Sequence, residues 1–308
     1  MELHQLRYFQ AVTQFSSFTR AAAHEHVAQP SLSQQIRKLE DELGARLFNR
    51  LGRKITLTPF GERFQQHAQR VLLEIEGARH DIEEIKGLRQ GHVSLGVIPT
   101  VAPYLLPSLL RAFRMAGPSI TATICEDLTH SLTARLAGGE LDLALLSLPV
   151  PGSEFVAEAT LSDRMLLALP GHHRLLRQRR RRISFDEVAE EPFLLLKDGH
   201  CFRDDVLNLC KRSHLSLNIV FEAGQFDTLL AMVAAGHGIT LLPEMGRHRF
   251  KHSGVKLLEL ERPEPRRTIG LVRWRAKFLS PAARLLIDLA AQTFRSLGAG
   301  TGSRSRRA

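Results

Sequence analysis

Residues 28–44 read Ala-Gln-Pro-Ser-Leu-Ser-Gln-Gln-Ile-Arg-Lys-Leu-Glu-Asp-Glu-Leu-Gly, a stretch that predicts a helix starting directly after a tight turn. Pro30 suits the first helical turn, where a missing N–H costs nothing, and no breaker follows until Gly44. One side of this helix is apolar, with Ile36, Leu39 and Leu43. The N-terminal end of the other side carries Gln29, Pro30, Ser31, Ser33, Gln34 and Arg37.

Two shorter helical patterns precede this helix. Leu3, Leu6 and Phe9 recur at helical spacing, and a second helix is predicted from Phe18 to His24, where alanines allow close packing. This order of helices and turn is that of a helix-turn-helix, whose last helix enters the major groove of DNA by its N-terminus. We therefore expect the N-terminal side chains of the third helix to contact bases.

A basic loop follows the third helix. Residues 46–58 turn around a glycine, and Arg50, Arg53 and Lys54 lie beside that glycine, with Arg46 before them. Positive charges on such a wing meet phosphates, which gives salt-sensitive affinity and fixes register without choosing sequence. The alternative is a plain helical bundle with a solvated basic loop. The order of helices, turn, polar face and wing favours a winged helix-turn-helix.

A long helix is predicted next, because Thr58 and Pro59 make an N-cap and first-turn pair. Its apolar residues alternate steps of four and three, as in the heptad seam of a coiled coil. The seam consists of Phe64, Ala68, Val71, Ile75, Ala78, Ile82 and Ile85. We interpret it as a homodimer contact that pairs two recognition helices on a pseudo-palindromic site. The alternative is packing onto the chain's own domains.

From His92 onward the chain alternates short apolar strands with helices, which is an α/β pattern. One series runs to Leu146 and a second begins near Met165, while the strand from Thr268 and the helix from Pro281 return to the first series. Two doubly wound lobes joined by crossovers would place a ligand in the cleft between them, near helix N-termini.

These predictions divide the chain into segments. They are a winged helix-turn-helix domain at 1–58, a linker and dimerisation helix at 59–90, an effector-sensing domain at 91–298 and a disordered basic tail at 299–308. Within the effector-sensing domain we expect lobe I at about 91–163 and 268–298, and lobe II at about 164–267.

Composition limits the class of protein. Of the 308 residues, 44% are hydrophobic and 24% are charged, as in ordinary globular proteins, and the formal charge of +10 suits a polyanionic partner. No apolar run is long enough to span a membrane, so we expect a cytoplasmic protein without a membrane partner. The basic run at 174–182 lacks interleaved aromatics, so we interpret it as a solvated loop and not as a nucleic-acid contact.

Three cysteines are too few for a disulfide framework and lack zinc-type spacing, so we expect no metal and no cofactor. Cys125 falls in an apolar strand and is predicted to be structural. Cys201 and Cys210 fall in a predicted helix, where their Cα atoms would lie roughly 13 Å apart. A disulfide tolerates only about 7 Å between Cα atoms. Joining them would require the segment to unfold or repack, so an oxidant could produce a conformational signal.

The segment Ala28–Gly44 resembles the LysR-type transcriptional regulators, and the resemblance covers nearly the whole chain. In the C-terminal part the sequence is most similar to hydrogen-peroxide sensors of that family. The matching segments there are Ile98–Pro107, Thr129-His130, Gly199–Asp204 with Cys210, Met232–Gly236 and Pro263–Val272. The resemblance implies a winged helix-turn-helix, a linker helix and a two-lobed periplasmic-binding-protein-like (type 2) domain, usually assembled as a tetramer.

Carried over by position, the resemblance makes Cys201 the peroxidatic cysteine and Cys210 the resolving cysteine. The residues that it implies for the peroxide pocket and its support are Thr100, Thr129, His200, Asp204 and Arg267. Several neighbours of the cysteines differ from the best-known members, namely Phe202, Asp205, Val206, Leu207 and Leu209.

The attacking species in peroxide reduction is a thiolate, so we expect a lowered pKa for Cys201, with His200, Arg203 and a helix N-terminus as its causes. Thioredoxin-type or glutathione-type reductants would reset the switch. The other expected partners are double-stranded promoter DNA, further copies of the chain in a dimer or tetramer, and RNA polymerase.

Three functions follow from these observations. The first is a peroxide-responsive transcriptional activator switched by Cys201 and Cys210. The second is a regulator that senses a small metabolite, often a carboxylate, held by helix N-termini and Arg267, with ordinary buried cysteines. The third is a thiol peroxidase whose N-terminal helices only dimerise, and the helix-turn-helix argues against such an enzyme. We predict the first.

Overall fold

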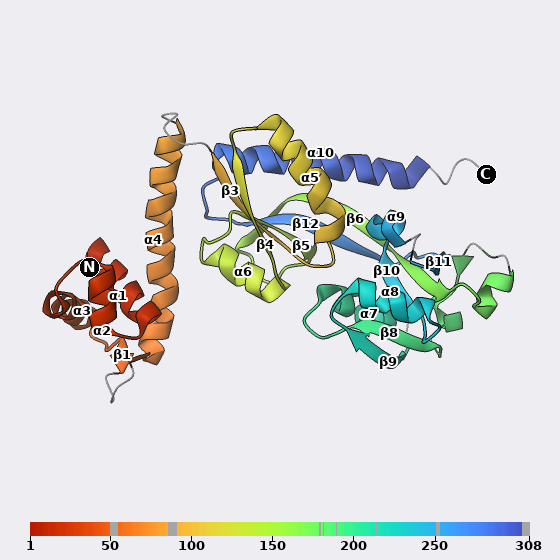
Figure 1. Cartoon of the computed structure of the whole chain (residues 1–308), viewed down its shortest axis with the longest axis horizontal. Coiled ribbons are helices and arrows are strands. Elements are labelled where there is room, and N and C mark those ends of the chain that lie inside the picture. The colour runs from red at the N-terminus through yellow and green to blue at the C-terminus, as the bar shows by residue number, and fades with distance from the viewer. Residues whose placement is uncertain are drawn as a thin grey trace. The chain divides into compact units, whose positions relative to one another are not determined.

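The structure is a computed structural model (Figure 1) that describes residues 1–49, 55–85, 91–178, 180, 182–188, 190–212, 215–250 and 253–303. The chain divides into two compact units, Met1–Arg89 with Ala137–Glu140, and Gln90–Leu136 with Leu141–Ala308. The predicted wing residues Arg50, Arg53 and Lys54 lie outside the described residues, as does the side chain of Ile85.

The first unit is a winged helix-turn-helix followed by a long helix. Its described elements are α1 (Leu3–Phe15), α2 (Phe18–His24), α3 (Gln29–Leu43), β1 (Phe48–Asn49), β2 (Thr56–Leu57) and α4 (Pro59–Ile85). β1 and β2 pair antiparallel, with Phe48 opposite Leu57, and form the base of the wing. Phe9, Leu32 and Ile36 are fully buried in the core of the unit, as their spacing predicts. Leu43 was placed on the apolar side by the sequence but is 41% exposed.

The start of α4 is fixed by a cap and by close packing. Thr58 Oγ1 accepts a hydrogen bond from the backbone N–H of Gly61 at 3.0 Å, so Thr58 is the predicted N-cap. A Cβ at Gly61 would lie 2.1 Å from the carbonyl oxygen of Leu47. Only glycine therefore lets the chain before β1 pack on the first turn of α4.

Lobe I of the second unit is a sheet in the order β4-β3-β5-β12-β6. Its elements are β3 (His92–Val97), α5 (Ala102–Ala116), β4 (Thr121–Glu126), α6 (Thr129–Ala137), β5 (Leu143–Leu148), the first part of β6 (Phe155–Pro170), β12 (Arg266–Trp274) and α10 (Pro281–Ser303). β3 lies parallel to β4 and β5, whereas β12 runs antiparallel to its neighbours. α5 and α10 contact each other over this sheet (Figure 1).

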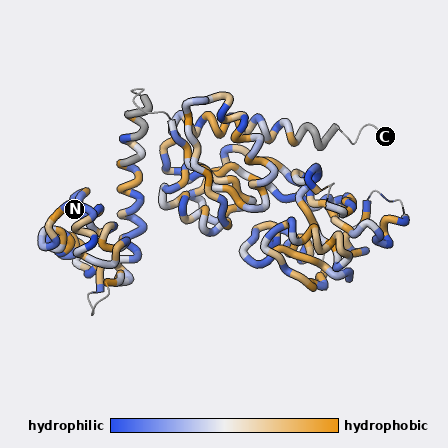
Figure 2. The backbone as a smooth tube through the Cα atoms, in the orientation of Figure 1, coloured by the Kyte–Doolittle hydropathy of each residue, from blue (hydrophilic) through white to orange (hydrophobic). Residues whose placement is uncertain are grey.

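Lobe II continues the sheet through the second part of β6, which pairs with β10 and β11. Its other elements are η1 (Arg174–Gln178), β7 (Arg182–Ile183), η2 (Phe185–Val188), β8 (Pro192–Leu196), α7 (Cys201–Arg212), β9 (Asn218–Ala223), α8 (Phe226–Ala234), β10 (Thr240–Pro243), η3 (Glu244–Gly246), α9 (Arg247–Phe250) and β11 (Val255–Leu260). Figure 2 shows that apolar residues follow the central strands of both lobes.

The two lobes have separate hydrophobic cores joined by β6. Leu161 lies in the core of lobe I and Met165 in the core of lobe II, only four positions later on the same strand. The predicted α/β fold of two lobes with crossovers is therefore confirmed. The strand that crosses between them brings polar residues of the crossover, such as Asp163, to the junction of the two cores.

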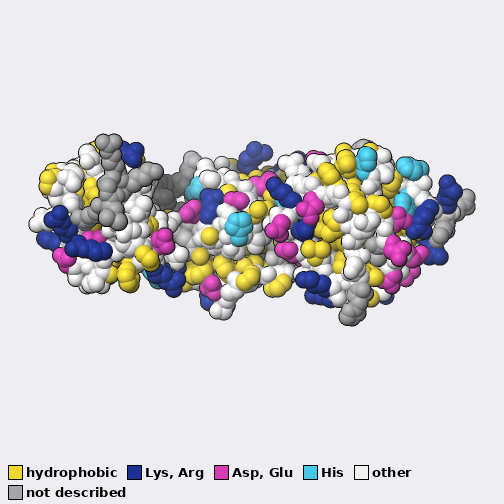
Figure 3. Space-filling view, turned by 90° about the horizontal axis from the view of Figure 1, so that it is seen from below, with side chains coloured by type: hydrophobic (Ala, Val, Ile, Leu, Met, Phe, Trp, Pro, Cys, Tyr) yellow, Lys and Arg dark blue, Asp and Glu magenta, His cyan; other side chains and the backbone are white. Residues whose placement is uncertain are grey.

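Two predictions about basic segments need correction. The run at 174–182 is solvated as the sequence predicts, since the side chains of Arg174 and Arg180 are more than half exposed, but its described part is not simply a loop. It contains η1 and the start of β7, and it is ion-paired to acidic residues that the sequence did not associate with it. These pairs are Arg174–Glu191 at 2.7 Å, Arg180–Glu187 at 3.1 Å and Arg182–Glu264 at 3.3 Å. Figure 3 shows acidic and basic side chains interspersed on the face that it presents. The tail was expected to be disordered from residue 299, yet α10 extends to Ser303, because glycines weaken a helix by only about 1 kcal/mol each and do not forbid it.

Candidate functional site

The N-terminal half of α3 presents the side chains that the sequence assigned to base contact. Ser33 is half-buried and the others are exposed, namely Gln29, Pro30, Ser31, Gln34 and Arg37. Leu32, Ile36 and Leu39 of the same helix are fully buried, so the exposed face takes no part in the core. This is the arrangement that contact with base edges requires.

A buried carboxylate that the sequence analysis missed holds the wing against α3. Glu40 is only 2% exposed, and its Oε1 accepts hydrogen bonds from the backbone N–H groups of Leu47 and Phe48, at 2.9 and 3.3 Å. Its Oε2 lies 2.9 Å from Nη1 of Arg46. Arg46, which the sequence grouped with the phosphate-contacting residues, therefore helps to anchor the wing. A glutamate on the buried side of an otherwise apolar stripe was the available signal.

The predicted dimer seam of α4 divides into two parts. Phe64 and Ala68 pack into the core of their own unit, and the Phe64 ring meets that of Phe9 edge-on at 5.0 Å. Ala68 is buried in its own unit and Phe64 is half-buried against Phe9 of α1, so these two residues fit the alternative interpretation, packing onto the chain's own domain. Val71 and Ile82 are 43% and 52% exposed and remain available for a partner. Ile75 is half-buried and Ala78 is exposed.

In the second unit, residues from both lobes meet around Cys201. Cys201 is the first residue of α7, and the turn before it depends on Gly199, whose φ of +92° favours glycine. Thr100 follows β3, and Thr129 is the first residue of α6. These positions follow the carboxyl ends of parallel strands, where open α/β sheets place their ligands. Although α7 belongs to lobe II, the Cys201 side chain packs against the core of lobe I.

Cys210 lies elsewhere, in the core of lobe II, where it is 4% exposed. Both cysteines are free, and one continuous helix separates them. Cys125 also has a free thiol; it is half-buried on β4, and a guanidinium nitrogen of Arg135 donates to its sulfur at 2.5 Å. The helix that the sequence predicts for Cys201 and Cys210 is confirmed, because α7 includes both cysteines.

Arg267 connects the two lobes beneath Cys201. Its side chain is 0% exposed, and its Nε donates to Asp163 Oδ2 at 3.0 Å. Its Nη1 and Nη2 donate to the hydroxyl and the carbonyl of Thr100, each at 3.0 Å. The guanidinium carbon also lies 4.9 Å from the centre of the Phe202 ring. A buried charge is tolerated only when it is paired and hydrogen-bonded, and Arg267 meets that condition through Asp163 and Thr100.

The electrostatics at Cys201 differ from the expectation. Burial raises the pKa of the Cys201 thiol, while the charge of Arg267 and the hydroxyls of Thr100 and Thr129 oppose the rise. The predicted lowering of the thiol pKa is therefore wrong for this reduced state. Burial also lowers the pKa of His200, so its ring is neutral at pH 7 and supplies no positive charge.

Arg203, the other cation that the sequence predicts near the Cys201 thiol, makes its contacts with other groups. Arg203 donates to the Leu196 carbonyl at 2.9 Å and to the carboxylate of Glu222 at 2.5 Å. The cation that favours the thiolate is Arg267, which comes from a strand far along the chain.

Two buried polar atoms near the thiol lack partners. Thr129 Oγ1 and His200 Nδ1 make no hydrogen bond of normal geometry with any described residue. Such atoms are rare in folded proteins and call for an explanation, such as a small polar molecule that binds there. Asp204 is exposed on α7 and does not join this group, whereas its neighbour Asp205 is half-buried.

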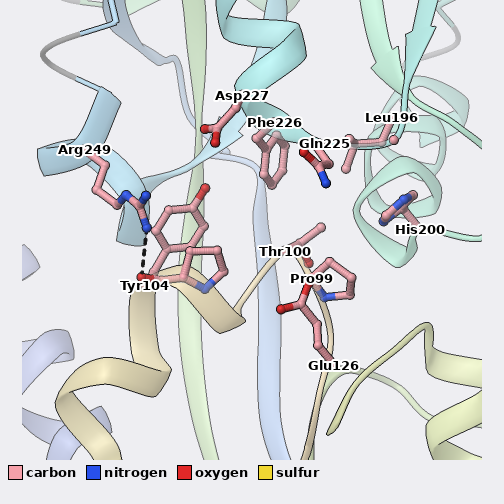
Figure 4. A pocket seen from close by; sticks show the side chains of 12 residues that line it. Pro99, Thr100, Tyr104, Glu126, Leu196, His200, Gln225, Phe226, Asp227 and Arg249 are labelled. Atoms are coloured by element: carbon pink, nitrogen blue, oxygen red, sulfur yellow. Dashed lines mark hydrogen bonds between the residues drawn. The ribbon is translucent and has the colours of Figure 1, made fainter.

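A cavity of about 210 Å³ opens between the lobes beside the thiol site. Thr100 and His200 line it together with polar groups from both lobes (Figure 4). Those further polar side chains are Tyr104, Glu126, Gln225, Asp227 and Arg249. The cavity is large enough for a small organic molecule, whereas a peroxide would need only the groups nearest Cys201.

The described residues hold no group of three histidine, cysteine or carboxylate side chains that could bind a metal ion. Within the same part of the chain, no helix combines the length and the apolar character needed to cross a bilayer.

Comparison with known proteins gives matches along most of the chain. Residues 3–62 match the family described as bacterial regulatory helix-turn-helix protein, lysR family, and residues 86–295 match the LysR substrate binding domain. The chain is 37% identical to the DNA-binding transcriptional dual regulator OxyR of Escherichia coli K12, over 94% of this chain and 96% of that protein. It is also 37% identical to the hydrogen peroxide-inducible genes activator of Pectobacterium carotovorum, over 88% and 90%.

Solved structures agree with these matches. Full-length OxyR from Pseudomonas aeruginosa, in a cysteine-to-aspartate variant, superposes with a TM-score of 0.73 at 30% identity and covers 96% of this chain and 95% of that one. A hydrogen peroxide-bound cysteine-to-serine variant of Corynebacterium glutamicum OxyR gives a TM-score of 0.63 at 29% identity, with 98% and 96% covered.

Proposed function

Because the chain belongs to the LysR family of bacterial helix-turn-helix regulators, we propose that it is a peroxide-responsive transcriptional activator with Cys201 and Cys210 as its switch. The observation that carries this proposal is the environment of Cys201. The thiol lies at a helix N-terminus near the buried charge of Arg267, and two neighbouring polar atoms, Thr129 Oγ1 and His200 Nδ1, make no hydrogen bond of normal geometry with any described residue. A bound peroxide would supply the missing hydrogen bonds.

The proposed reaction uses the thiolate of Cys201. Its sulfur attacks one peroxide oxygen, the O–O bond breaks, and the second oxygen leaves as hydroxide, which takes up a proton. Thr100 and Thr129 orient the peroxide and stabilise the departing oxygen. The Cys210 thiol then attacks the sulfenic acid of Cys201, so that a disulfide forms and water leaves. One thioredoxin-type dithiol, or two glutathione-type thiols in succession, supplies the two electrons that restore both thiols and is itself left as a disulfide.

The second step requires a change in α7. Nine helical residues separate the two Cα atoms by roughly 13 Å, and a disulfide tolerates about 7 Å. The thiols also pack against different cores, Cys201 against lobe I and Cys210 within lobe II. The disulfide therefore forms only when α7 opens, and this opening is the proposed signal.

In the proposed complex with promoter DNA, the exposed face of α3 reads base edges and the wing contacts phosphates. The face consists of Gln29, Pro30, Ser31, Ser33, Gln34 and Arg37, and the wing contributes Arg50, Arg53 and Lys54. Copies of the chain associate as a dimer or tetramer through the exposed apolar part of α4, and RNA polymerase is the partner in activation. In this proposal residues 1–58 bind DNA, residues 59–90 form the dimer contact and residues 91–298 sense the effector.

The decisive experiment maps the thiols after oxidation. Reduced protein is treated with about one equivalent of hydrogen peroxide, quenched and digested with trypsin without reductant. Trypsin cuts after Lys197, Arg203 and Lys211, so Cys201 and Cys210 fall in different peptides. Rapid formation of a linked pair of these peptides, with Cys125 still free, supports the switch. Unchanged thiols contradict it.

A matched pair of variants separates the switch from DNA binding. Cys201→Ser should bind promoter DNA as the parent does but lose the oxidant-dependent change in footprint. Cys125→Ser should keep that change. A normal oxidant response in Cys201→Ser would exclude the proposed switch.

The inter-lobe cavity favours one alternative, a regulator that senses a small metabolite. Tyr104, Gln225, Asp227 and Arg249 offer hydrogen bonds and charge to an organic molecule in that space. Stabilisation of the protein by such a molecule in a thermal screen, together with unreactive thiols, would favour this function over the peroxide switch.

A further inference from the structure

Asp205 shares one face of α7 with Cys201. The two are four positions apart in the helix, so their side chains lie one turn from each other on the same side. Asp205 is half-buried, whereas its neighbour Asp204 is exposed. The Asp205 Oδ2 accepts a hydrogen bond from Ser147 Oγ on β5 at 3.2 Å, which fixes the carboxylate at the junction of the two lobes.

The charges that face Asp205 come from three directions. Arg267 on β12 attracts it, and Asp163 on β6 and Asp204 on α7 repel it. Burial raises the pKa of Asp205, while Arg267 and the Ser147 hydroxyl lower it. An aspartate must gain about three pKa units to be protonated at pH 7. Asp205 also lines a cavity of about 710 Å³ together with Arg267, and the charge of Arg267 and the hydrogen bond from Ser147 both favour its ionised form.

Cys201 and Asp205 thus share one cation. Arg267 is fully buried and is the charge that stabilises a thiolate at Cys201. A carboxylate within one helical turn of the thiol also interacts with the positive charge of Arg267, and it repels the thiolate directly. Nothing in the proposed peroxide reaction itself uses Asp205.

We propose that Asp205 is a positioning residue that holds Cys201 in its protonated, slowly reacting form by competing with it for the charge of Arg267. The chain would then respond only to oxidant levels high enough to overcome this restraint. The proposal rests on the proposed role of Cys201 as the reactive thiol, but its test measures thiolate content and is independent of the natural oxidant.

The test compares the pH dependence of Cys201 alkylation in the full chain and its variants. Reduced protein is treated with iodoacetamide at a series of pH values, and modification is read by mass spectrometry on the tryptic peptide Asp198–Arg203, whose one cysteine is Cys201. Asp205→Asn keeps the size of the side chain and an acceptor for Ser147 but removes the charge. Loss of a like charge at this range is expected to lower the midpoint by about one pH unit and to speed alkylation at pH 7 about tenfold.

Two further variants keep the result interpretable. Asp186→Asn removes an exposed carboxylate that lines the same 710 Å³ cavity, and its profile should match the parent. Asp205→Glu keeps the charge and should stay within about twofold of the parent. An unshifted midpoint in Asp205→Asn, or equal shifts in Asp205→Asn and Asp205→Glu, would overturn the proposal, because a merely structural role responds to shape and not to charge. If peroxide did not join Cys201 to Cys210, the pH profile of Cys201 alkylation would still show the effect of Asp205, so the two proposals can fail separately.

Discussion

At the scale of single residues, the side chain with most consequences is Arg267. It donates hydrogen bonds to Asp163 on β6 and to Thr100 after β3, and it is the positive charge that favours the thiolate of Cys201. The sequence suggested Arg267 through a family resemblance but gave no sign of Asp163. The two residues are 104 positions apart, and no local pattern links residues so distant.

Arg267→Ala should therefore be strongly destabilising. Removing one partner of a buried ion pair leaves the other charge uncompensated, which costs about 3–5 kcal/mol of unfolding free energy. Urea unfolding measures the loss. The control is Arg266→Ala, since Arg266 is exposed and its pair with Glu264 is worth about 1 kcal/mol or less. Equal losses in the two variants would mean that burial of the Arg267 pair is not what matters.

The Cys210 thiol makes the unfolding free energy of the protein depend on pH in the alkaline range. Burial raises its pKa to about 11, whereas an unfolded cysteine ionises near pH 8.5. The folded state holds the proton more tightly, so this stabilisation is present in full below about pH 8 and is lost as the pH rises toward 11. Under reducing conditions, the difference in unfolding free energy between the parent and Cys210→Ala should shrink over that range. A difference independent of pH would contradict the prediction.

At the scale of elements, the sequence predicts what depends on local pattern. The bounds of α2, the N-cap of α4 and the helix that holds both cysteines follow from spacing, caps and breakers. Local pattern does not predict Glu40 as the anchor of the wing, because its carboxylate is buried by contacts with backbone N–H groups that follow the end of α3. The spacing predicts the apolar seam of α4, but periodicity alone does not say whether the chain's own unit or a second copy covers each residue.

The two parts of the seam should respond differently to substitution. Phe64→Ala removes a ring from the core of the first unit and should cost about 3 kcal/mol of stability. Ile82→Glu changes an exposed position, so the unfolding free energy of the isolated chain should stay within about 0.5 kcal/mol. Self-association should weaken at least tenfold in Ile82→Glu, because two like charges would meet in a dimer. Sedimentation equilibrium and thermal unfolding measure the two effects, and unchanged association would remove α4 from the interface.

At the scale of the whole molecule, the proposed function places DNA reading and oxidant sensing on different compact units. The basic residues of the two units also differ in whether acidic side chains pair with them. Arg37 is exposed on α3, whereas several arginines of lobe II are paired with glutamates and leave little charge for a polyanion. The net charge of +10 was therefore a poor guide to where DNA binds.

Arg37→Ala should separate the two activities. Loss of a base contact is expected to weaken binding to a duplex selected from a random pool by about 10–100-fold, with little effect on a scrambled duplex. The melting temperature and the rate of Cys201–Cys210 pairing should stay as in the parent. Fluorescence anisotropy measures the affinities, with Arg7→Ala as the control because Arg7 is paired with Glu25 on the same unit. A large fall in melting temperature would make Arg37 structural.

The location of the two cysteines in separate cores has a consequence for timing. A dissociable ligand leaves as its concentration falls, so a sensor that binds one follows its surroundings moment by moment. A bond between Cys201 and Cys210 would persist after the oxidant has gone, because the opened α7 cannot refold while the sulfurs are joined. Such a chain keeps a memory of past exposure, and the supply of reductant decides how long that memory lasts.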